Sequence, residues 1–281
     1  MIENRPTLNA LTHVTLVIGI VIVIFPIYIA FVASTHEARD ILMTVQGWFG
    51  TNFIENYSTV LEKGKASTGS ISVALMMWNS LVMALGIVVG KISISILSAY
   101  AIVYFRFPFR MFFFWMIFVT LMLPVEVRIL PTYEVVANLG LLNTYPGLVL
   151  PLIASATATF LFRQFFLTIP DELAEAARVD GAGPFRFFFD ILLPLSRTNI
   201  AALFVILFIY GWNQYLWPLL VTTEQNMTTI VMGIQAMLYV PDDINEWNIT
   251  MATAILAMLP PVLIIIVMQR QFVKGLVETE K

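Results

Sequence analysis

The sequence predicts an all-α membrane protein with six transmembrane helices, and three observations lead to this class. Of the 281 residues, 59% are hydrophobic and only 12% are charged, whereas a soluble domain carries about 25% charged residues. The hydrophobic residues form long blocks, as helical spans require, and not the short alternating segments of outer-membrane strands. The basic residues gather on one side of these blocks, as the positive-inside rule describes.

Six blocks are long enough to cross a bilayer, because about 20 helical residues span about 30 Å of hydrocarbon. The second block exceeds this length, so we expect it to be tilted or to begin outside the hydrocarbon. Together the blocks predict a single transmembrane domain over residues 1–281, with a cytoplasmic loop at 167–194. The predicted spans are residues 14–33, 73–105, 111–133, 145–166, 198–221 and 249–268.

Individual blocks carry features that shape the expected helices. Block 14–33 is longer than the apolar core of a secretory signal, and no clean small-x-small cleavage site follows it, so we interpret it as a retained helix. Pro124 and Pro131 in the third block favour a broken helix. Pro260 and Pro261 in the last block predict a kink.

The distribution of Lys and Arg sets the predicted orientation. With a cytoplasmic N-terminus, ten basic residues lie in inner segments and three lie in the first outer loop, 34–72. The other two, Lys91 and Arg128, lie within apolar blocks. This excess predicts that both termini are cytoplasmic and that loops 34–72 and 222–248 face outward. Trp48 and other aromatic residues of the first loop form either an interfacial or packed cluster or a contact surface for an external partner.

Composition excludes several classes of function. The chain has no cysteine, so disulfides and thiolate chemistry are ruled out. Its two histidines, His13 and His36, are too far apart to be helix neighbours, and we expect no metal site. No GxxxxGK[ST] motif, nucleophile–base pair or basic stripe is present. We therefore expect no ATP hydrolysis or other catalysis by this chain, no bound cofactor and no nucleic-acid binding.

Residues 167–194 predict two short helices joined by a glycine turn. Thr168 is the predicted N-cap of the first helix, with Pro170 in its first turn. Gly181 suits a left-handed C-terminal stop, and Gly183-Pro184 restarts a helix. The spacing thus predicts a helical hairpin on the cytoplasmic side.

The first of these helices has about ten residues, fewer than the 12–15 that an isolated helix needs in water. Leu173, Ala176 and Ala177 share one of its faces, and the two small side chains allow another surface to approach closely. The helix therefore either docks on a partner or is an ordinary connecting loop with a good cap.

The motif Glu175-Ala176-Ala177, followed by Gly181 and then by Ile191-x-Leu193-Pro194, resembles the EAA loop of binding-protein-dependent ABC importers. In that family the loop forms coupling helices that sit in a cleft of the ATPase subunit. The resemblance implies that Glu175 pairs with a basic residue of the ATPase, that Ala176 and Ala177 pack in the cleft, and that Gly181 permits the turn. The residues implied in coupling are Glu175, Ala176, Ala177, Asp180, Gly181, Ile191, Leu193 and Pro194.

The resemblance extends over nearly the whole chain. Segments 98–101, 105–108, 211–218 and 269–276 are similar to permeases of the carbohydrate-uptake family, and 123–129 is similar to the permease subunits of sn-glycerol-3-phosphate importers. This similarity implies the type I importer permease fold and a location in the cell inner membrane. It also implies four kinds of partner: a second related permease, two ATPase subunits that hold ATP and Mg²⁺, a periplasmic substrate-binding protein, and membrane lipid.

The implied function is translocation of sn-glycerol-3-phosphate, and of glycerophosphodiesters, by alternating access. One alternative is the same role for a neutral sugar or oligosaccharide. The other is an ion-coupled secondary transporter that uses Glu126 as its ion site, against which the EAA spacing argues. In the maltose member of the family the longer permease supplies the sugar contacts, so the resemblance leaves open which subunit contacts the substrate.

Five polar residues within apolar blocks are candidates for the substrate pathway. A charge near the centre of a span costs roughly 2.5–3.5 kcal/mol on insertion scales, so such residues need partners or a wet cavity. Lys91 and Arg128 would attract a phosphate, and Glu126 would balance them in the empty cavity. In the structural alternative these charges bond neighbouring helices or Lys91 snorkels to an interface. Asn213 and Gln214 either bond across helices or line the pathway.

Overall fold

The computed structural model describes residues 6–64, 71–120, 125–238 and 246–277, and within these ranges the regular structure is helical, with no strand. The chain divides into two compact units. Unit 1 comprises Met1–Leu75 and Gly233–Leu259, and unit 2 comprises Met76–Met232 and Pro260–Lys281. Each unit is described by itself below.

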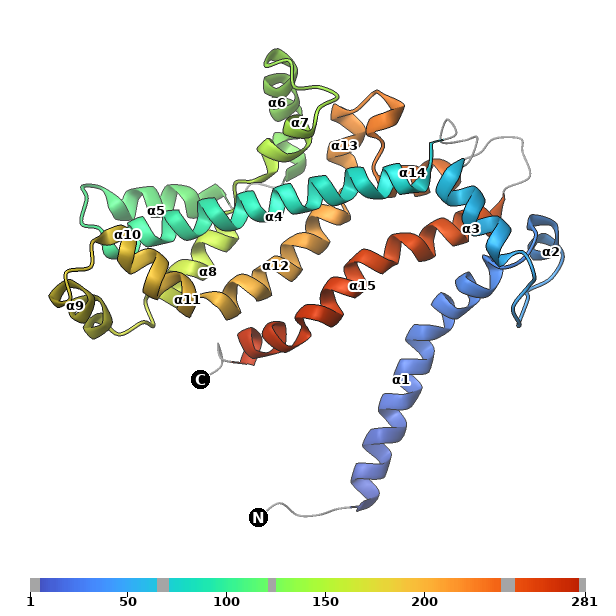
Figure 1. The fold of residues 1–281 in the computed structure, drawn as a ribbon, viewed down its shortest axis with the longest axis horizontal. Helices are drawn as coiled ribbons and strands as arrows, with labels where there is room; N and C mark the ends of the chain where they lie inside the picture. Colours follow the sequence, from blue (N-terminus) through green and yellow to red (C-terminus); the bar gives the residue numbers. More distant parts are fainter. Residues whose placement is uncertain (1–5, 65–70, 121–124, 239–245, 278–281) are drawn as a thin grey trace. The chain divides into compact units, whose positions relative to one another are not determined.

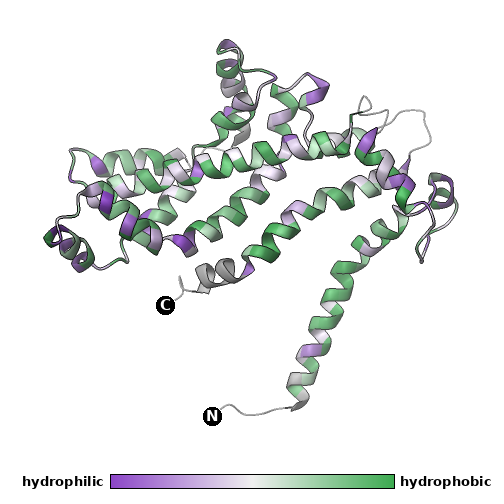
Figure 2. Cartoon of the chain, viewed as in Figure 1, coloured by the Kyte–Doolittle hydropathy of each residue, from purple (hydrophilic) through white to green (hydrophobic). Residues whose placement is uncertain are grey.

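Unit 1 is built on α1 (Pro6–Ala33) and the first half of α15 (Trp247–Val277). It also holds α2 (Ala38–Met43) and α3 (Phe53–Glu62), which belong to the segment after α1. Hydrophobic residues cover nearly all of α1 (Figure 2), and large side chains such as Ile22 and Val23 are each 66% exposed. Exposure of so much apolar surface to water is unfavourable, so lipid or another chain must cover α1.

The corner of unit 1 after α1 is held by buried polar groups and by rings. Asn56 donates from Nδ2 to the carbonyl oxygens of Ser34 and His36, over 2.9 and 2.8 Å. Phe31 makes edge contacts with Phe49 and Phe53. The aromatic residues of this loop therefore include a packed cluster.

In unit 2 the long helix α4 (Val73–Tyr104) is the element against which the shorter helices pack (Figure 1). Ser95 donates to the carbonyl of Ser155 over 3.2 Å, which ties α4 to the start of α8. The remaining elements of unit 2 are α5 (Arg110–Val119), α6 (Val125–Asn138), α7 (Tyr145–Val149), η3 (Leu150–Leu152), α8 (Ala156–Phe166), α9 (Asp171–Val179), α10 (Pro184–Arg186), η4 (Phe187–Leu192), α11 (Leu193–Leu195), α12 (Arg197–Trp212), α13 (Leu216–Val221) and η5 (Gln225–Met227). Helix α14 (Ile230–Leu238) begins in unit 2, and its residues from Gly233 onward belong to unit 1.

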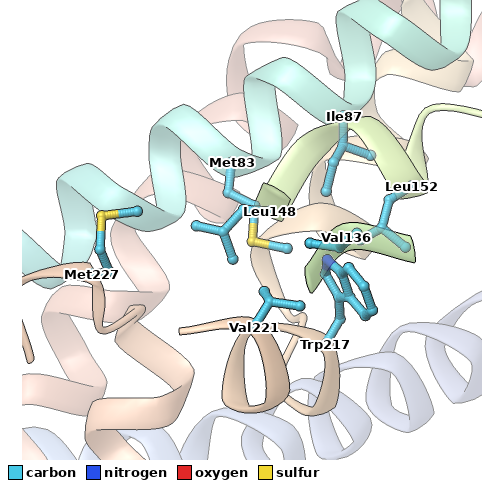
Figure 3. Close-up of a cluster of buried hydrophobic side chains, with 8 residues drawn as sticks. All are labelled: Met83, Ile87, Val136, Leu148, Leu152, Trp217, Val221 and Met227. Carbon is cyan, nitrogen blue, oxygen red and sulfur yellow. The ribbon is translucent and has the colours of Figure 1, made fainter. Parts of the chain in front are cut away.

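A cluster of buried side chains joins four α-helices of this unit, α4, α6, α7 and α13, with the short helices η3 and η5 (Figure 3). Trp217 from α13 is 3% exposed, and its indole N–H donates to the carbonyl of Gly147 over 3.2 Å. This bond satisfies the one polar atom of a ring that is otherwise surrounded by hydrocarbon. The cluster consists of Met83, Ile87, Val136, Leu148, Leu152, Trp217, Val221 and Met227.

Helices α4 and α12 approach closely at one pair of small residues. A Cβ atom built on Gly211 would lie 2.9 Å from Cα of Ala84 and 3.4 Å from its Cβ. Small residues of this kind allow membrane helices to pack backbone against backbone. Gly211 therefore fixes the distance between the two helices.

The predicted spans correspond to helices with more breaks than expected. Within the described ranges, α1, α4 and α15 are each long and apolar enough to cross a membrane, and two bent helix pairs raise this number to five. The fourth predicted block bends by 49° between η3 and α8. The third falls on α5 and α6, and the fifth on α12 and α13. Helix α15 continues through Pro260 and Pro261.

Candidate functional site

The predicted cytoplasmic loop contains α9, and its start differs from the sequence prediction. Asp171 is the first residue of the helix and Pro170 occupies the N-cap position. The hydroxyl of Thr168, predicted as the cap, instead donates to the carbonyl of Phe165 over 2.7 Å. The prediction was wrong because α9 begins three residues after Thr168, so that Pro170 and not Thr168 occupies the N-cap position. Asp171 and Glu172 still complement the positive end of the helix.

The end of α9 matches the prediction in detail. Gly181 has a φ of +73°, in the left-handed region. Its N–H donates to the carbonyl of Arg178, and the N–H of Ala182 donates to the carbonyl of Ala177 over 2.8 Å. This pair of bonds is the Schellman motif, which satisfies the last carbonyls of a helix and turns the chain sharply. The left-handed stop at Gly181 is therefore confirmed.

The two alanines of the EAA motif face different surroundings. Ala177 is 5% exposed and lies beside a cavity of about 260 Å³ that Tyr100 and Tyr104 of α4 also line. Glu175 and Ala176 are exposed. Ala177 is thus covered by its own chain, whereas Glu175 and Ala176 are accessible, and the contact of this motif with a partner stays a prediction.

The second helical segment restarts where the sequence indicated. Gly183 is its N-cap and Pro184 its first residue, and the hydroxyl of Tyr100 donates to the carbonyl of Pro184 over 2.8 Å. The segment then forms a π-helix, η4, before α11. Ile191, Leu193 and Pro194 are half-buried. Tyr100 therefore ties the turn of the loop directly to one end of α4.

The opposite end of α4 holds a second set of polar contacts. Asn79 donates from Nδ2 to the carbonyls of Asn226 and Thr228, over 2.8 and 3.0 Å, and accepts from the hydroxyl of Tyr145 over 2.7 Å. Asn79 and Tyr100 are twenty-one residues apart on one helix, which is about 31 Å at 1.5 Å per residue. This separation is close to the hydrocarbon thickness of a bilayer, about 30 Å, so α9 and the loop after α13 lie at opposite ends of a membrane-length helix.

The structure places one pathway candidate, Lys91, against the ring of Tyr210, whereas another, Gln214, bonds to the backbone of its own segment. Lys91 is 8% exposed, and its Nζ lies 3.9 Å from the ring centroid of Tyr210. Gln214 donates to the carbonyl of Tyr210 over 3.1 Å. Lys91 therefore points into protein and does not snorkel to an interface. Tyr210 had no role in the sequence prediction, although a Tyr inside an apolar block is a signal for such a contact.

The other pathway candidates that the structure describes are more exposed than Lys91. Arg128 is exposed on α6. Asn213 is exposed at the end of α12. The side chain of Glu126 lies outside the described residues. Arg163, at the end of α8, lies over the ring of Phe114 with its guanidinium carbon 4.3 Å from the centroid.

Apolar helices of membrane length, together with the bent helix pairs, are those of a multi-pass membrane protein. The chain belongs to the family described as "Binding-protein-dependent transport system inner membrane component", whose profile matches residues 91–278. This assignment also establishes a location in the inner membrane.

Full-length relatives and a solved structure agree with this family. The chain is 62% identical to "sn-glycerol-3-phosphate transport system permease protein UgpE" of Agrobacterium fabrum, 61% identical to the protein of that name in Brucella melitensis, and 58% identical to that in Salmonella typhi, with 100% of both chains covered in each case. A chain of a bacterial ABC transporter involved in the import of the acidic polysaccharide alginate has a similar fold, with a TM-score of 0.81, 20% identity and coverage of 97% of this chain and 99% of that one. The fold is thus that of a type I importer permease.

Proposed function

We propose that this permease imports sn-glycerol-3-phosphate, together with glycerophosphodiesters, across the inner membrane by alternating access. The observation that carries the proposal is the 58–62% identity, over the full length, to permeases named for sn-glycerol-3-phosphate transport. Its partners are a second related permease, two ATPase subunits and a periplasmic binding protein. The chain itself performs no catalysis and holds no cofactor, because ATP and Mg²⁺ bind to the ATPase subunits.

The ATPase subunits act on the permease through α9. The exposed Glu175 and Ala176 meet the ATPase, and movement of the ATPase pair pushes on this helix. The buried Ala177 and the hydrogen bond from Tyr100 to Pro184 transmit this movement to α4. Helix α4 then moves as a rigid body, because its backbone hydrogen bonds are made within the helix. Asn79 at the far end of α4 carries the motion to the outer loops. Both termini are cytoplasmic, in agreement with the excess of basic residues there.

The substrate contact lies around Lys91 and Tyr210. A buried ammonium group is costly without a counter-charge, and the ring face of Tyr210 compensates for part of this cost. A phosphate that enters beside Lys91 and Arg128 supplies a negative charge through charge-assisted hydrogen bonds. The amide of Gln214 is held by the carbonyl of Tyr210 and offers a further donor. An anionic substrate therefore gains more from this cluster than a neutral sugar does.

A reconstituted complex tests the function. Proteoliposomes that contain both permeases, the ATPase and the binding protein are expected to take up labelled sn-glycerol-3-phosphate only with ATP, and vanadate is expected to stop uptake. An excess of a glycerophosphodiester should compete, whereas maltose should not. Uptake that follows an ion gradient and resists vanadate would refute the ATP-driven mechanism, and competition by maltose alone would refute the substrate.

Orientation is tested separately with the cysteine-free chain. Single cysteines at Glu62→Cys and Glu280→Cys provide one reactive thiol each. An impermeant maleimide applied to spheroplasts is expected to label the first position directly and the second only after permeabilisation. The reverse pattern would contradict the proposed topology.

A further inference from the structure

Two arginines lie where α5 packs against α8 in unit 2 (Figure 1). Phe114 of α5 is 5% exposed, and Arg163, in the last turn of α8, holds its guanidinium carbon 4.3 Å from the centroid of this ring. Arg110 is the first residue of α5 and precedes Phe114 by one helical turn, about 6 Å along the axis. Because residues four apart share a face of a helix, Arg110 begins on the face of α5 that carries Phe114.

These arginines have no anionic partner in the part of the chain that the structure describes. The ring of Phe114 attracts the face of the Arg163 guanidinium, and the Nε of Arg163 is buried. Its terminal Nη groups are not buried, and no described residue accepts a hydrogen bond from them. Within the described ranges the one ion pair joins Arg186 to Asp190. The positive charges of Arg110 and Arg163 are therefore open to an anion from outside the chain.

The pair lies at the end of unit 2 that holds the coupling loop. The short segment 105–109 joins the end of α4 to the start of α5. Helix α8 ends at Phe166, and the next helix is α9, whose Ala177 lines the same cavity as Tyr104 at the end of α4. The proposed topology makes this end cytoplasmic, and the inference rests on the proposed function for that orientation alone. Arg110 and Arg163 thus lie at the level of the headgroups of the inner leaflet.

Helix α5 has an apolar surface that no described residue covers. Phe112, Trp115 and Met116 are 62%, 54% and 50% exposed. The ten residues of α5 extend over about 15 Å, which is half of the hydrocarbon thickness of about 30 Å. Apolar surface therefore runs over the depth of one leaflet, with Arg110 at its headgroup end. A phospholipid has the same arrangement, because its phosphate lies at one end of its acyl chains.

A lipid phosphate matches both parts of this surface, whereas a soluble anion matches only one. Arginine binds phosphate through charge-assisted, bidentate hydrogen bonds, and basic sites between membrane helices on the cytoplasmic side bind lipid headgroups. Free phosphate would reach the arginines but leave the apolar side of α5 uncovered. Two positive charges also favour a lipid of net negative charge over a zwitterionic one, whose cationic group they repel.

We propose that Arg110 and Arg163 bind the phosphate of an anionic phospholipid of the inner leaflet, and that an acyl chain of this lipid lies along α5. The phosphate bridges the cytoplasmic ends of α5 and α8. Arg163 supplies its Nη donors while the ring of Phe114 holds its guanidinium in place, and Arg110 supplies the second charge.

Site-specific quenching tests this lipid contact in the complete transporter, with its partner chains made cysteine-free. The permease itself has no cysteine, so Met116→Cys carries a single bimane fluorophore on α5. In phosphatidylcholine nanodiscs, phosphatidylglycerol with a doxyl group on its acyl chain is expected to quench this fluorophore at a lower lipid fraction than doxyl-phosphatidylcholine. The ratio of the two binding constants measures the preference for the anionic lipid.

The arginine variants, made in the Met116→Cys background, decide whether the preference comes from this site. The double variant Arg110→Gln, Arg163→Gln is expected to lower the ratio about tenfold. Arg110→Gln alone, at a helix end, should lower it about threefold and does not disturb the more enclosed Arg163. Arg186→Gln removes a charge from the same end of unit 2, where Asp190 pairs with it, and should leave the ratio unchanged. An unchanged ratio in Arg110→Gln and in the double variant, or an equal loss in Arg186→Gln, would overturn the proposal.

Two further outcomes identify a different occupant. If neither doxyl lipid quenches the fluorophore, another chain covers α5 and the lipid site is refuted. If excess inorganic phosphate at equal ionic strength relieves the quenching by phosphatidylglycerol, the arginines bind a soluble anion and the lipid site is again refuted. Failure of sn-glycerol-3-phosphate uptake in proteoliposomes would overturn the proposed function but would leave this quenching ratio as it is.

Discussion

The close contact between Gly211 and Ala84 makes replacement of Gly211 by alanine a sharp test of the packing in unit 2. The added Cβ would lie 2.9 Å from a backbone atom, Cα of Ala84, and a backbone cannot rotate away as a side chain can. Helices α4 and α12 must therefore separate or shift. Overpacking of this kind costs about 1–3 kcal/mol, which exceeds the gain of about 1 kcal/mol from the better helix propensity of alanine.

The assay is the thermal midpoint of the purified transporter, followed by loss of the monodisperse peak in size-exclusion chromatography. Gly19→Ala is the matched control, because nothing lies within 4 Å of a Cβ at Gly19 in α1, and it should leave the midpoint equal or higher. The double variant Gly211→Ala, Ala84→Gly should recover little, because Cα of Ala84 remains in place. A midpoint of Gly211→Ala equal to that of Gly19→Ala would refute the reasoning.

Three further predictions concern the coupling loop and the pathway. Gly181→Ala adds a Cβ that meets nothing within 4 Å, but it places an alanine at a φ of +73°. It should therefore cost about 1 kcal/mol of stability and lower the amount of substrate transported per ATP hydrolysed. The control Gly183→Ala, at a φ of −70°, should change neither quantity. Tyr100→Phe removes one donor to the carbonyl of Pro184, which still accepts from the N–H of Phe187, so it should destabilise by about 1 kcal/mol and reduce transport more than ATPase activity; equal reductions would argue against a coupling role. Lys91→Gln should raise the KM for sn-glycerol-3-phosphate at least tenfold, as expected for loss of one charge-assisted contact of about 1.5–3 kcal/mol, while Lys63→Gln, in the exposed loop after α3, should leave KM unchanged.

Local rules predicted the coupling loop well where neighbouring residues decide the structure. The left-handed stop at Gly181 and the restart at Pro184 depend only on backbone preferences of those residues. The N-cap prediction at Thr168 failed because α9 begins only at Asp171, with Pro170 at the N-cap position. Local sequence did not indicate the first residue of this helix.

Contacts between segments that are distant in the sequence could not be predicted from it. The bond from Asn248 to Asn56 joins residues 192 positions apart, and the contact of Lys91 with Tyr210 joins α4 to α12. The burial of Ala177 depends on the end of α4, so helical periodicity alone could not assign Ala176 and Ala177 to different surroundings. Helical periodicity shows which residues share a face of the helix, but tertiary packing determines which surface covers that face.

Because η4 is a π-helix, the number of residues in the EAA motif determines the direction of the chain that follows it. In an α-helix each residue turns the chain by about 100°, and the wider i→i+5 turns of a π-helix take up more residues per turn. Leu193 and Pro194 therefore point where they do, relative to Pro184, because Phe187–Leu192 winds more loosely than an ordinary helix. Deleting one residue from this stretch would rotate everything beyond it by about 100° about the axis of η4. Because α12 is bent by 70° from this segment, that rotation would change the direction in which α12 leaves the loop. The number of residues between Gly181 and Pro194 therefore sets the direction of a membrane helix as well as being a signature of the family.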